Sequence, residues 1–413
     1  MYNESTLKQL NVRFAWARRT YPHIFRPENL KLLTLEDMYR LPVMEKEDCF
    51  ASSLDLANAD YCALMASGGT SGRRTMTLQS LNDFLCEGEI VADLYSSILP
   101  PGKFGFANTL AAGGLWGGGF MLFIASMSHK RFIGLNVGNR TPAEMVNLLH
   151  GFVTEVPEVE GILLVGLPTT LVEMATITAT EGRHLKVAAI VYGGEGLEQA
   201  QTRHLILSFK PKAGIHAYSS SSEGNCIGFS LGEDNLLLSP VYNSCFMWLM
   251  DPATRDPIME AGIPGRVVVT NLYASCKPFN FASNNMAIWE EVGEMFRLQG
   301  RVQDFVSFGN LGALRFNGQN LIEPILEFTR ATRCQLHIDD QETLRIVVDR
   351  MSDSAVPTTK ERLADVILDL ILSIAPFANE QLLRAKLKIP VDVGEIVTTE
   401  VGKTPLVIDH RKV

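Results

Sequence analysis

Short apolar runs without charge alternate with helix-forming segments through the middle of this 413-residue chain. The runs at 161–165 and 187–192 are typical of buried strands. Segments with helical patterns lie beside them at 141–153, 168–180 and 196–209, the first with a capping box and a proline in its first turn. Strands that alternate with helices predict βαβ units and a mostly parallel sheet, in which ligands bind at the carboxyl ends of the strands.

The pattern changes toward the C-terminus, and this change predicts more than one domain. Residues 265–300 carry the strand-like runs of a small antiparallel subdomain. Residues 303–413 combine strands near 334–338 and 343–349 with an amphipathic helix that starts at Pro357-Thr358. We therefore expect an α/β protein. Its large N-terminal domain, 1–302, holds mostly parallel sheets flanked by helices, and 303–413 forms a small α+β domain.

Residues 1–60 are polar and irregular, and they predict a peripheral cap on the N-terminal domain. Helices are expected near 4–20 and 34–48. A long uncharged run, 105–128, reaches the length of a membrane span. Its six glycines favour a buried strand, loop and helix of the α/β core, so no membrane insertion is expected.

Composition limits the functional classes. The formal net charge of −9 argues against nucleic acid as the main partner. The seven cysteines are odd in number and form no Cys-x-x-Cys pair, which fits free thiols in a reducing compartment, so we expect a cytoplasmic protein. A zinc site from Cys226, Cys245 and Cys276 with a histidine stays open as a less favoured alternative.

A loop rich in glycine and hydroxyl groups follows the apolar run 62–66. Its residues are Ser67, Gly68, Gly69, Thr70, Ser71, Gly72 and Arg73, with Arg74 and Thr75 behind them. Glycines let backbone N–H groups approach an anion closely, hydroxyls add neutral donors, and the arginines add fixed charge. The loop therefore predicts a binding site for a phosphate chain. A plain surface turn is the simpler alternative. It is not a P-loop, because no Gly-Lys-Ser/Thr follows at the required spacing.

This loop resembles the phosphate-binding signature of adenylate-forming enzymes, Ser-Ser-Gly-Thr-Thr-Gly-x-Pro-Lys/Thr, with Arg74 where proline is usual. Further stretches resemble the same family in the same order, and they favour the branch similar to phenylacetate–coenzyme A ligase. The stretch 113–118, which includes Gly114 and Trp116, is similar to the segment that lines the acyl pocket. The run Tyr192, Gly193, Gly194 and Glu195 is similar to the turn that borders adenine and the acyl group.

The segment 217–224 resembles the family motif Tyr-Gly-x-Thr/Ser-Glu. By that resemblance Glu223 holds Mg²⁺, Ser222 contacts phosphate, and Tyr218 packs on adenine. One residue more than in the family pattern lies between Tyr218 and Glu223, so we expect a bulge within 219–222. Mg²⁺ prefers carboxylate and phosphate oxygens, and this preference suits Glu223.

The last motifs carry a ribose site, a hinge and a catalytic lysine. Residues 265–285 resemble the stretch that ends in the family's ribose-binding Asp, and Asn285 takes that place here. An amide still accepts hydrogen bonds but without charge assistance, so weak ATP binding is expected. Arg301 and Asp304 fall on the hinge signature, and the resemblance assigns Arg301 to the ribose and Asp304 to the hinge. Lys403 matches the lysine that reaches the substrate carboxylate and the α-phosphate.

The resemblance implies a two-step reaction. A carboxylic acid attacks the α-phosphorus of MgATP and gives an acyl-adenylate and pyrophosphate. The small C-terminal domain, mobile in the family, then turns, and a thiol, usually coenzyme A, takes the acyl group. We expect a small aromatic acid, because Trp116, Tyr192, Tyr218 and Phe281 are candidates to line an aromatic pocket.

Two alternatives remain open. In the first, the enzyme hands its adenylate to a reductase or carrier protein in natural-product biosynthesis, for example of a phenazine. In the second, the chain is a non-catalytic scaffold that binds an acyl or aryl ligand. The Asn284-Asn285 pair favours the scaffold, whereas Lys403 and Glu223 count against it. A homodimer is also left open.

Overall fold

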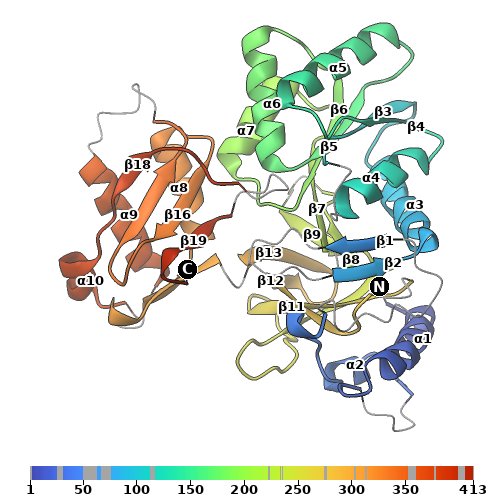
Figure 1. Ribbon diagram of the computed structural model, residues 1–413, viewed down its shortest axis with the longest axis horizontal. Coiled ribbons are helices and arrows are strands. Elements are labelled where there is room, and N and C mark those ends of the chain that lie inside the picture. Colours follow the sequence, from blue (N-terminus) through green and yellow to red (C-terminus); the bar gives the residue numbers. More distant parts are fainter. Residues whose placement is uncertain are drawn as a thin grey trace. The chain divides into compact units, whose positions relative to one another are not determined.

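The computed structural model of this protein describes residues 2–25, 31–49, 63–66, 76–111, 117–221, 224–232, 234, 236–273, 277–301, 304–311, 314–351, 360–375, 378–398 and 405–412. Its contacts divide the chain into two compact units, shown in Figure 1. Unit 1 comprises Met1–Glu195 and Ile206–Leu298, and unit 2 comprises Gly196–Leu205 and Gln299–Val413. The segment 196–205, predicted within the N-terminal domain, therefore packs with unit 2.

Five parallel strands form the centre of unit 1, in the order β4-β3-β5-β6-β7. They are β3 (Phe104–Asn108), β4 (Phe132–Asn136), β5 (Ile162–Gly166), β6 (Val187–Gly193) and β7 (Ile215–Ser221). Every residue of β3 and β5 is buried. Strands covered on both faces read as continuous apolar runs, and this explains why β5 and β6 could be predicted from the sequence. The predicted α/β class is confirmed.

Helices cover both faces of these parallel strands (Figure 1). Val91 and Leu122 of the first two helices pack with Phe106 of β3 in one buried cluster. On the other face a Cβ added at Gly105 would lie 2.8 Å from the Phe152 ring, so that helix rests directly on the strand. The helices are α3 (Leu81–Ser97), α4 (Gly117–Met127), α5 (Pro142–Glu155), α6 (Pro168–Glu181) and the part of α7 (Gln199–Phe209) from Ile206 onward, which belongs to unit 1.

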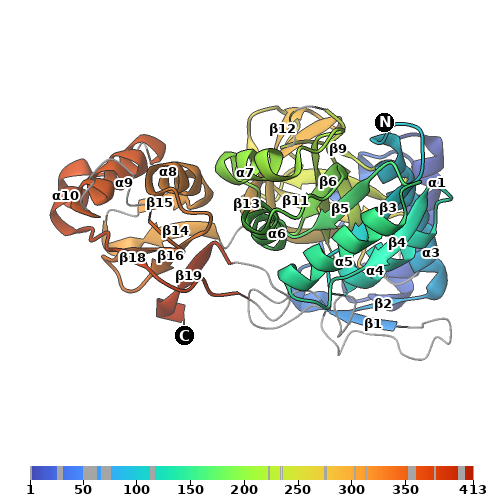
Figure 2. The same ribbon diagram turned by 90° about the horizontal axis from the view of Figure 1, so that it is seen from above.

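Antiparallel strands continue the same sheet beyond β7, in the order β7-β8-β9-β13-β12-β11-β10. The strands predicted at 265–300 belong to this part. It is built from β8 (Asn225–Phe229), β9 (Leu237–Pro240), β10 (Cys245–Met250), β11 (Pro264–Asn271), β12 (Phe281–Glu291) and β13 (Met295–Arg301). A separate antiparallel hairpin, β1 (Ala63–Ala66) and β2 (Met76–Gln79), lies at the margin of unit 1 in Figure 2.

The N-terminal segment is packed into unit 1. Helix α1 (Glu4–Thr20) buries Arg13, whose Nε donates to the Asn271 carbonyl at 3.1 Å. The single helix predicted near 34–48 is wrong: a short α2 (Asp37–Arg40) and a 3-10 turn η1 (Lys46–Cys49) stand there instead. Pro42 explains the break, because a proline disfavours helical backbone in the residue before it. Among the described residues, no helix has the length and apolar character needed to cross a bilayer.

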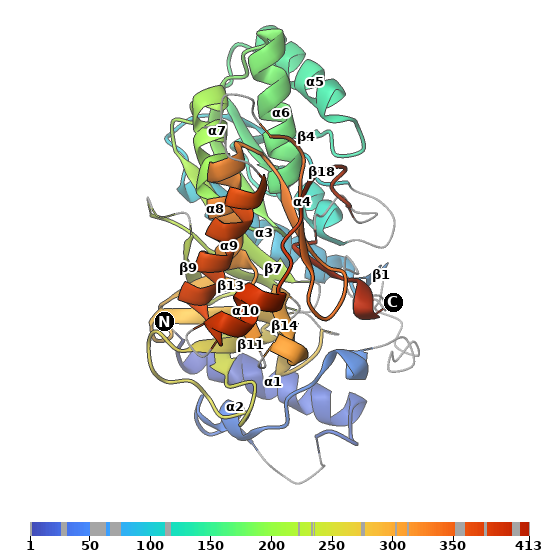
Figure 3. The same ribbon diagram turned by 90° about the vertical axis from the view of Figure 1, so that its left-hand side faces the viewer.

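Unit 2 is built on a four-stranded sheet in the order β18-β17-β16-β19. Strands β16 and β17 are antiparallel, and β18 and β19 add parallel to the two sides. Figure 3 shows α8 and α9 side by side against this sheet. The elements are β14 (Phe305–Phe308), η4 (Gly309–Leu311), β15 (Leu314–Asn317), α8 (Gln319–Thr329), β16 (Cys334–Ile338), β17 (Leu344–Val348), α9 (Lys360–Ile374), α10 (Glu380–Lys386), β18 (Val391–Val393), β19 (Val407–Asp409) and η5 (His410–Lys412).

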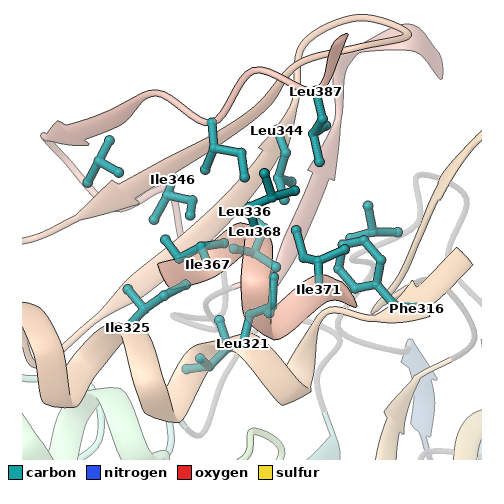
Figure 4. Packing of buried hydrophobic residues seen from close by; sticks show 14 of the residues in the cluster. Phe316, Leu321, Ile325, Leu336, Leu344, Ile346, Ile367, Leu368, Ile371 and Leu387 are labelled. Atoms are coloured by element: carbon teal, nitrogen blue, oxygen red, sulfur yellow. The ribbon is translucent and has the colours of Figure 1, made fainter. Parts of the chain in front are cut away.

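The core of unit 2 lies between the two long helices and the sheet, as Figure 4 shows. Leu321 and Ile325 of α8 point toward Ile367 and Ile371 of α9, and all four side chains are fully buried. Burial of one such side chain contributes about 1.5–3 kcal/mol to folding. The strands predicted near 334–338 and 343–349 are confirmed, whereas the predicted start of the long helix at Pro357-Thr358 lies outside the described residues.

A carboxyl pair in unit 2 brings two partly buried carboxyl groups, Glu198 and Glu323, close together. Glu198 lies just before α7 and accepts a hydrogen bond from Gln319 Nε2. Glu323 of α8 accepts from the backbone N–H groups of Gln199 and Ala200 at 2.7 and 3.1 Å, at the N-terminus of α7. Burial, followed by the charge of Glu323, raises the pKa of Glu198 from 4.5 to about 8.

This raised pKa predicts a specific dependence of stability on pH. Between about pH 4.5 and 8 the folded protein keeps a proton on Glu198 that the unfolded chain has lost, so this residue lowers the free energy of unfolding as the pH rises through that window. Glu198→Gln removes the titration. We expect the melting temperature of this variant to fall less across the window than that of the unaltered protein.

Thermal unfolding followed by circular dichroism measures this difference. Glu327→Gln is the matched control, because Glu327 is a half-exposed carboxylate of the same helix pair. Parallel pH profiles for Glu198→Gln and the unaltered protein would contradict the assignment.

Candidate functional site

The carboxyl ends of the parallel strands carry a set of fixed polar groups. At the end of β3, Asn108 is fully buried, and its Nδ2 donates to the Gly119 carbonyl at 3.0 Å and to Asn136 Oδ1 at 3.1 Å. The Thr109 hydroxyl donates to the Val165 carbonyl at 2.9 Å. These bonds join the ends of β3, β4 and β5 to the start of α4. The edge at which a ligand is expected is therefore held rigidly.

The end of β6 is shaped by two adjacent glycines with different roles. A Cβ on Gly193 would lie 2.4 Å from the Tyr218 carbonyl oxygen of β7, a distance that no side chain tolerates. Gly194 has φ +82°, in the left-handed region that favours glycine. The chain can therefore leave β6 sharply while staying close to β7. Tyr192, directly before this turn, is 4% exposed.

Glu195 follows the glycine turn, and its carboxylate is held in place. Its Oε2 accepts from the backbone N–H of Thr169 at 3.2 Å and from the Thr169 hydroxyl at 2.7 Å. Thr169 lies in the first turn of α6, where backbone N–H groups favour an anion. Glu195 thus joins the glycine turn after β6 to the first turn of α6. Thr169 was not predicted as a site residue, although its place directly after the predicted strand and Pro168 offered a signal.

Several predicted site residues lie outside the described residues. They are Ser67, Gly68, Gly69, Thr70, Ser71, Gly72, Arg73, Gly114, Trp116, Ser222, Glu223 and Lys403. Their neighbours in the chain are described, and these neighbours show which parts of unit 1 the segments connect.

The residues that flank three of these segments lie together in unit 1. The hairpin strands β1 and β2 enclose the glycine-rich loop, with Ala66 paired to Met76. Gln79, at the end of β2, donates through Nε2 to Asn225 Oδ1 at 3.4 Å. Asn225 lies two residues after Glu223 in the chain. On the same hairpin, Met65 Cγ would be 3.2 Å from a Cβ on Gly117, the residue that follows the 112–116 segment.

The turn that carries Ser222 and Glu223 has ordered ends. Gly224 donates its backbone N–H to Ser221 Oγ at 2.8 Å, and Asn225 has φ +58°. Asn225 Nδ2 donates to the Tyr273 hydroxyl at 2.8 Å. The register of β7 and β8 shifts between Ser219 and Ser220, where the additional residue belongs to β8. The bulge was predicted within the serines themselves.

Tyr218 does not lie where the resemblance placed it. Its side chain is 7% exposed, its ring meets the Tyr95 ring edge-on at 5.8 Å, and its hydroxyl donates to Glu87 at 3.5 Å. A ring with so little free surface offers no face to an adenine. The predicted stacking role of Tyr218 is therefore corrected to a packing role in the core under α3.

Glu87 is a buried carboxyl group that sequence reasoning missed. It is 1% exposed, and its Oε1 accepts the backbone N–H of Cys226 at 2.8 Å. Burial raises the pKa of Glu87 well above its usual range, and the positive charge of Lys277 opposes this shift. The signal was available, because Glu87 falls on the apolar stripe of α3, between Phe84 and Val91.

The ribose and hinge candidates lie in different units and are described separately. Asn285 is half-buried on β12 in unit 1, and its backbone N–H donates to Ser283 Oγ at 3.2 Å. In unit 2, Asp304 Oδ2 accepts from the backbone N–H of Arg301 at 2.7 Å, and Gly300 before it has φ +76°. Burial raises the pKa of Asp304, and the charge of Arg301 lowers it. The hydrogen bond with Arg301 joins Asp304 to the last residue of β13.

The contact at Gly193 makes a testable prediction about the framework of the site. Gly193→Ala places a methyl group against the backbone of β7, which has no freedom to move aside, so we expect a loss of about 1–3 kcal/mol in the free energy of unfolding. Gly151→Ala is the control, because a Cβ there meets nothing within 4 Å and α5 gains a better helix former. Urea unfolding measures both variants; equal stability of Gly193→Ala and the unaltered protein would refute the close approach.

Comparison with known proteins gives structural neighbours only. No protein-family model matches the sequence, and no curated protein sequence matches it either. A solved structure of 2-hydroxyisobutyryl-CoA ligase with 2-HIB-AMP is similar with a TM-score of 0.76 at 15% identity, over 99% of this chain and 90% of that one. ATP-bound MatB from Rhodopseudomonas palustris is similar with a TM-score of 0.61 at 15% identity, over 84% of this chain and 67% of that one.

The anthranilate CoA ligase AuaEII with anthranoyl-AMP is a third neighbour, with a TM-score of 0.56 at 14% identity, over 84% of this chain and 66% of that one. All three neighbours are described with an adenylate or ATP bound. The chain therefore has the fold of the adenylate-forming acyl-CoA ligases.

Proposed function

We propose that this protein activates a carboxylic acid with ATP as an acyl-adenylate and then transfers the acyl group to a thiol, with coenzyme A as the acceptor. One observation carries the proposal. The described flanks of the glycine-rich loop, of the 112–116 segment and of the Ser222-Glu223 turn meet in unit 1 through Gln79, Asn225, Met65 and Gly117. A phosphate grip, an acyl-pocket segment and a metal-binding carboxylate are the three parts that acid adenylation requires in one place.

The proposed roles follow the chemistry of each group. Backbone N–H groups and hydroxyls of the loop from Ser67 to Gly72, with Arg73, hold the β- and γ-phosphates. Glu223 supplies a carboxylate oxygen of the kind Mg²⁺ prefers, between Ser221 and Gly224, which are already hydrogen-bonded to each other. Bound Mg²⁺ neutralises charge on the phosphates. Gly194 and Glu195 border the adenine and acyl groups, and Asn285 and Arg301 hold the ribose.

The reaction balances without a further reactant. A carboxylate oxygen attacks the α-phosphorus, the bond to the bridging oxygen breaks, and pyrophosphate leaves. Lys403 neutralises the carboxylate and α-phosphate during this step. The thiol sulfur then attacks the acyl carbon, AMP leaves, and the thiol proton passes to solvent. The hinge that lets the small domain take part in both steps is placed at Asp304.

We further propose an aromatic acid as the substrate. Trp116 and Tyr192 support this choice from the sequence, and the neighbour with anthranoyl-AMP has a fold that accepts an aromatic acyl group. Tyr218 no longer supports it, because its ring is buried under α3. A reductase or carrier protein in place of coenzyme A is the competing acceptor, and the protein is expected to act in the cytoplasm.

Acid-dependent exchange of radioactive pyrophosphate into ATP tests this function. A panel of aryl, acyl and amino acids is offered with MgATP, and each active acid is then tested for thioester formation with coenzyme A. We expect exchange with at least one aryl acid. No exchange with any acid, together with saturable binding of an acid, would replace the proposal by a non-catalytic scaffold.

Lys403→Ala separates the two half-reactions. We expect a loss of pyrophosphate exchange of at least about a hundredfold, the size seen when one preorganised charge is removed from a transition state. Thioester formation from supplied acyl-adenylate is expected to stay within about twofold, an energy difference below 1 kcal/mol. Lys388→Ala, an exposed lysine of the same unit, is the control. Equal loss of both half-reactions would remove Lys403 from this role.

Asn285→Asp tests the ribose assignment. A carboxylate accepts a hydroxyl hydrogen bond with charge assistance, so ATP binding is expected to tighten by up to about tenfold. Asn284→Asp is the matched control, because it adds the same charge one residue away in the same irregular part of β12. Calorimetric titration with MgATP measures both variants; unchanged binding by Asn285→Asp, or equal gains in both, would place the ribose elsewhere.

A further inference from the structure

Two histidines and an aspartate of unit 2 lie together at one end of its sheet. His337 stands near the end of β16, and Asp339 follows that strand directly. His410 begins η5, immediately after β19. Because β16 and β19 pair in parallel, with Ile338 opposite Asp409, both chain segments leave the sheet at the same end. The cluster lies entirely within unit 2, and nothing in the adenylation chemistry uses it.

The spacing of the three side chains suits a metal ion. His337 Nδ1 lies 3.0 Å from His410 Nε2, and His410 Nε2 lies 3.8 Å from Asp339 Oδ1. One ligand atom from each residue falls within 4.8 Å of the other two. Two imidazole nitrogens at about 2.0–2.1 Å from a tetrahedral zinc ion are roughly 3.3 Å apart. The observed separations therefore require only small side-chain movements to enclose such an ion.

The contacts of His337 set its tautomer. Arg345 Nη2 lies 3.5 Å from His337 Nδ1, and a guanidinium can only donate. Nδ1 therefore presents a lone pair toward Arg345 and His410, and the ring proton is on Nε2. An imidazole lone pair directed toward a second imidazole nitrogen, that of His410, is placed for a shared metal ion.

Asp339 is oriented by the same arginine. Arg345 Nε donates to Asp339 Oδ2 at 2.7 Å, and Nη2 donates to Oδ1 at 2.9 Å. Each carboxylate oxygen keeps a second lone pair, so Oδ1 can accept from Arg345 and still ligate an ion. Such outer partners are common around metal sites, where they fix the ligand and tune its affinity. The positive charge of Arg345 is expected to make the binding weaker than in a site without it.

We propose that His337, Asp339 and His410 bind a zinc-class divalent ion, with water in the fourth position. Two imidazoles and one carboxylate favour such an ion, whereas Mg²⁺ prefers a set made only of oxygens. The site is therefore separate from the proposed MgATP chemistry. The bound ion links η5, which directly follows β19, to the end of β16. In the sequence β19 begins four residues after Lys403, so the ion stabilises the strand that follows that lysine in the chain.

Cobalt titration of the full-length protein tests the site without any measurement of activity. The protein is stripped with EDTA, Co²⁺ is added while the visible spectrum is recorded, and Zn²⁺ is then used to displace it. We expect one equivalent of Co²⁺ per chain, with the d–d bands of a nitrogen- and oxygen-ligated ion and no thiolate charge-transfer band. His410→Ala and Asp339→Asn are each expected to weaken binding at least about tenfold.

His184→Ala is the control, because its side chain is exposed on unit 1. The His410 side chain is 42% exposed, so its truncation is expected to cost little stability. An unchanged melting temperature of metal-free His410→Ala shows that the variant is folded. Three results would overturn the proposal: no saturable binding by the unaltered protein, a thiolate band that places the ion on cysteines, or equal affinity in His410→Ala, Asp339→Asn and the unaltered protein.

Discussion

The burial of both faces of the parallel strands governs the rest of unit 1. Helices cover β3 and β5 on both sides, and every residue of these two strands is removed from solvent. A strand in that position has no exposed face on which to place a functional group. Chemistry can therefore sit only where the strands end, at Asn108, Gly193 and the serines of β7. Gly105 and Gly193 show how closely the neighbouring elements approach.

A network of buried hydrogen bonds connects the elements next to that edge. Glu87 of α3 accepts the backbone N–H of Cys226, and so ties the helix to the strand that follows the Ser222-Glu223 turn. Asn225, the next residue back along β8, is tied to Gln79 of the hairpin and to Tyr273. An unpaired polar group at this depth would cost about 1–3 kcal/mol, so the network selects one arrangement of α3, β8 and the hairpin. These bonds join the described flanks of the glycine-rich loop and of the Ser222-Glu223 segment.

The sequence predicted the fold better than it predicted the roles of single residues. Continuous apolar runs identified β5 and β6, and a capping box identified α5, because these signals are local. The break at Pro42 could have been read from the sequence but was overlooked. The assignment of 196–205 to unit 2 depends on contacts with Glu323 and Gln319, which no local pattern reveals. Tyr218 was misplaced for the same reason, since only the fold shows that its ring faces Glu87.

We propose that the glycine-rich loop, the 112–116 segment and the Ser222-Glu223 segment form one nucleotide site at the carboxyl edge of the parallel sheet. A crystal structure of the full-length protein with MgATP tests it most directly. We expect the triphosphate between the β1-β2 hairpin and the end of β7, with the metal ion on Glu223. Nucleotide bound away from this edge, or none at a MgATP concentration that saturates binding in solution, would contradict it.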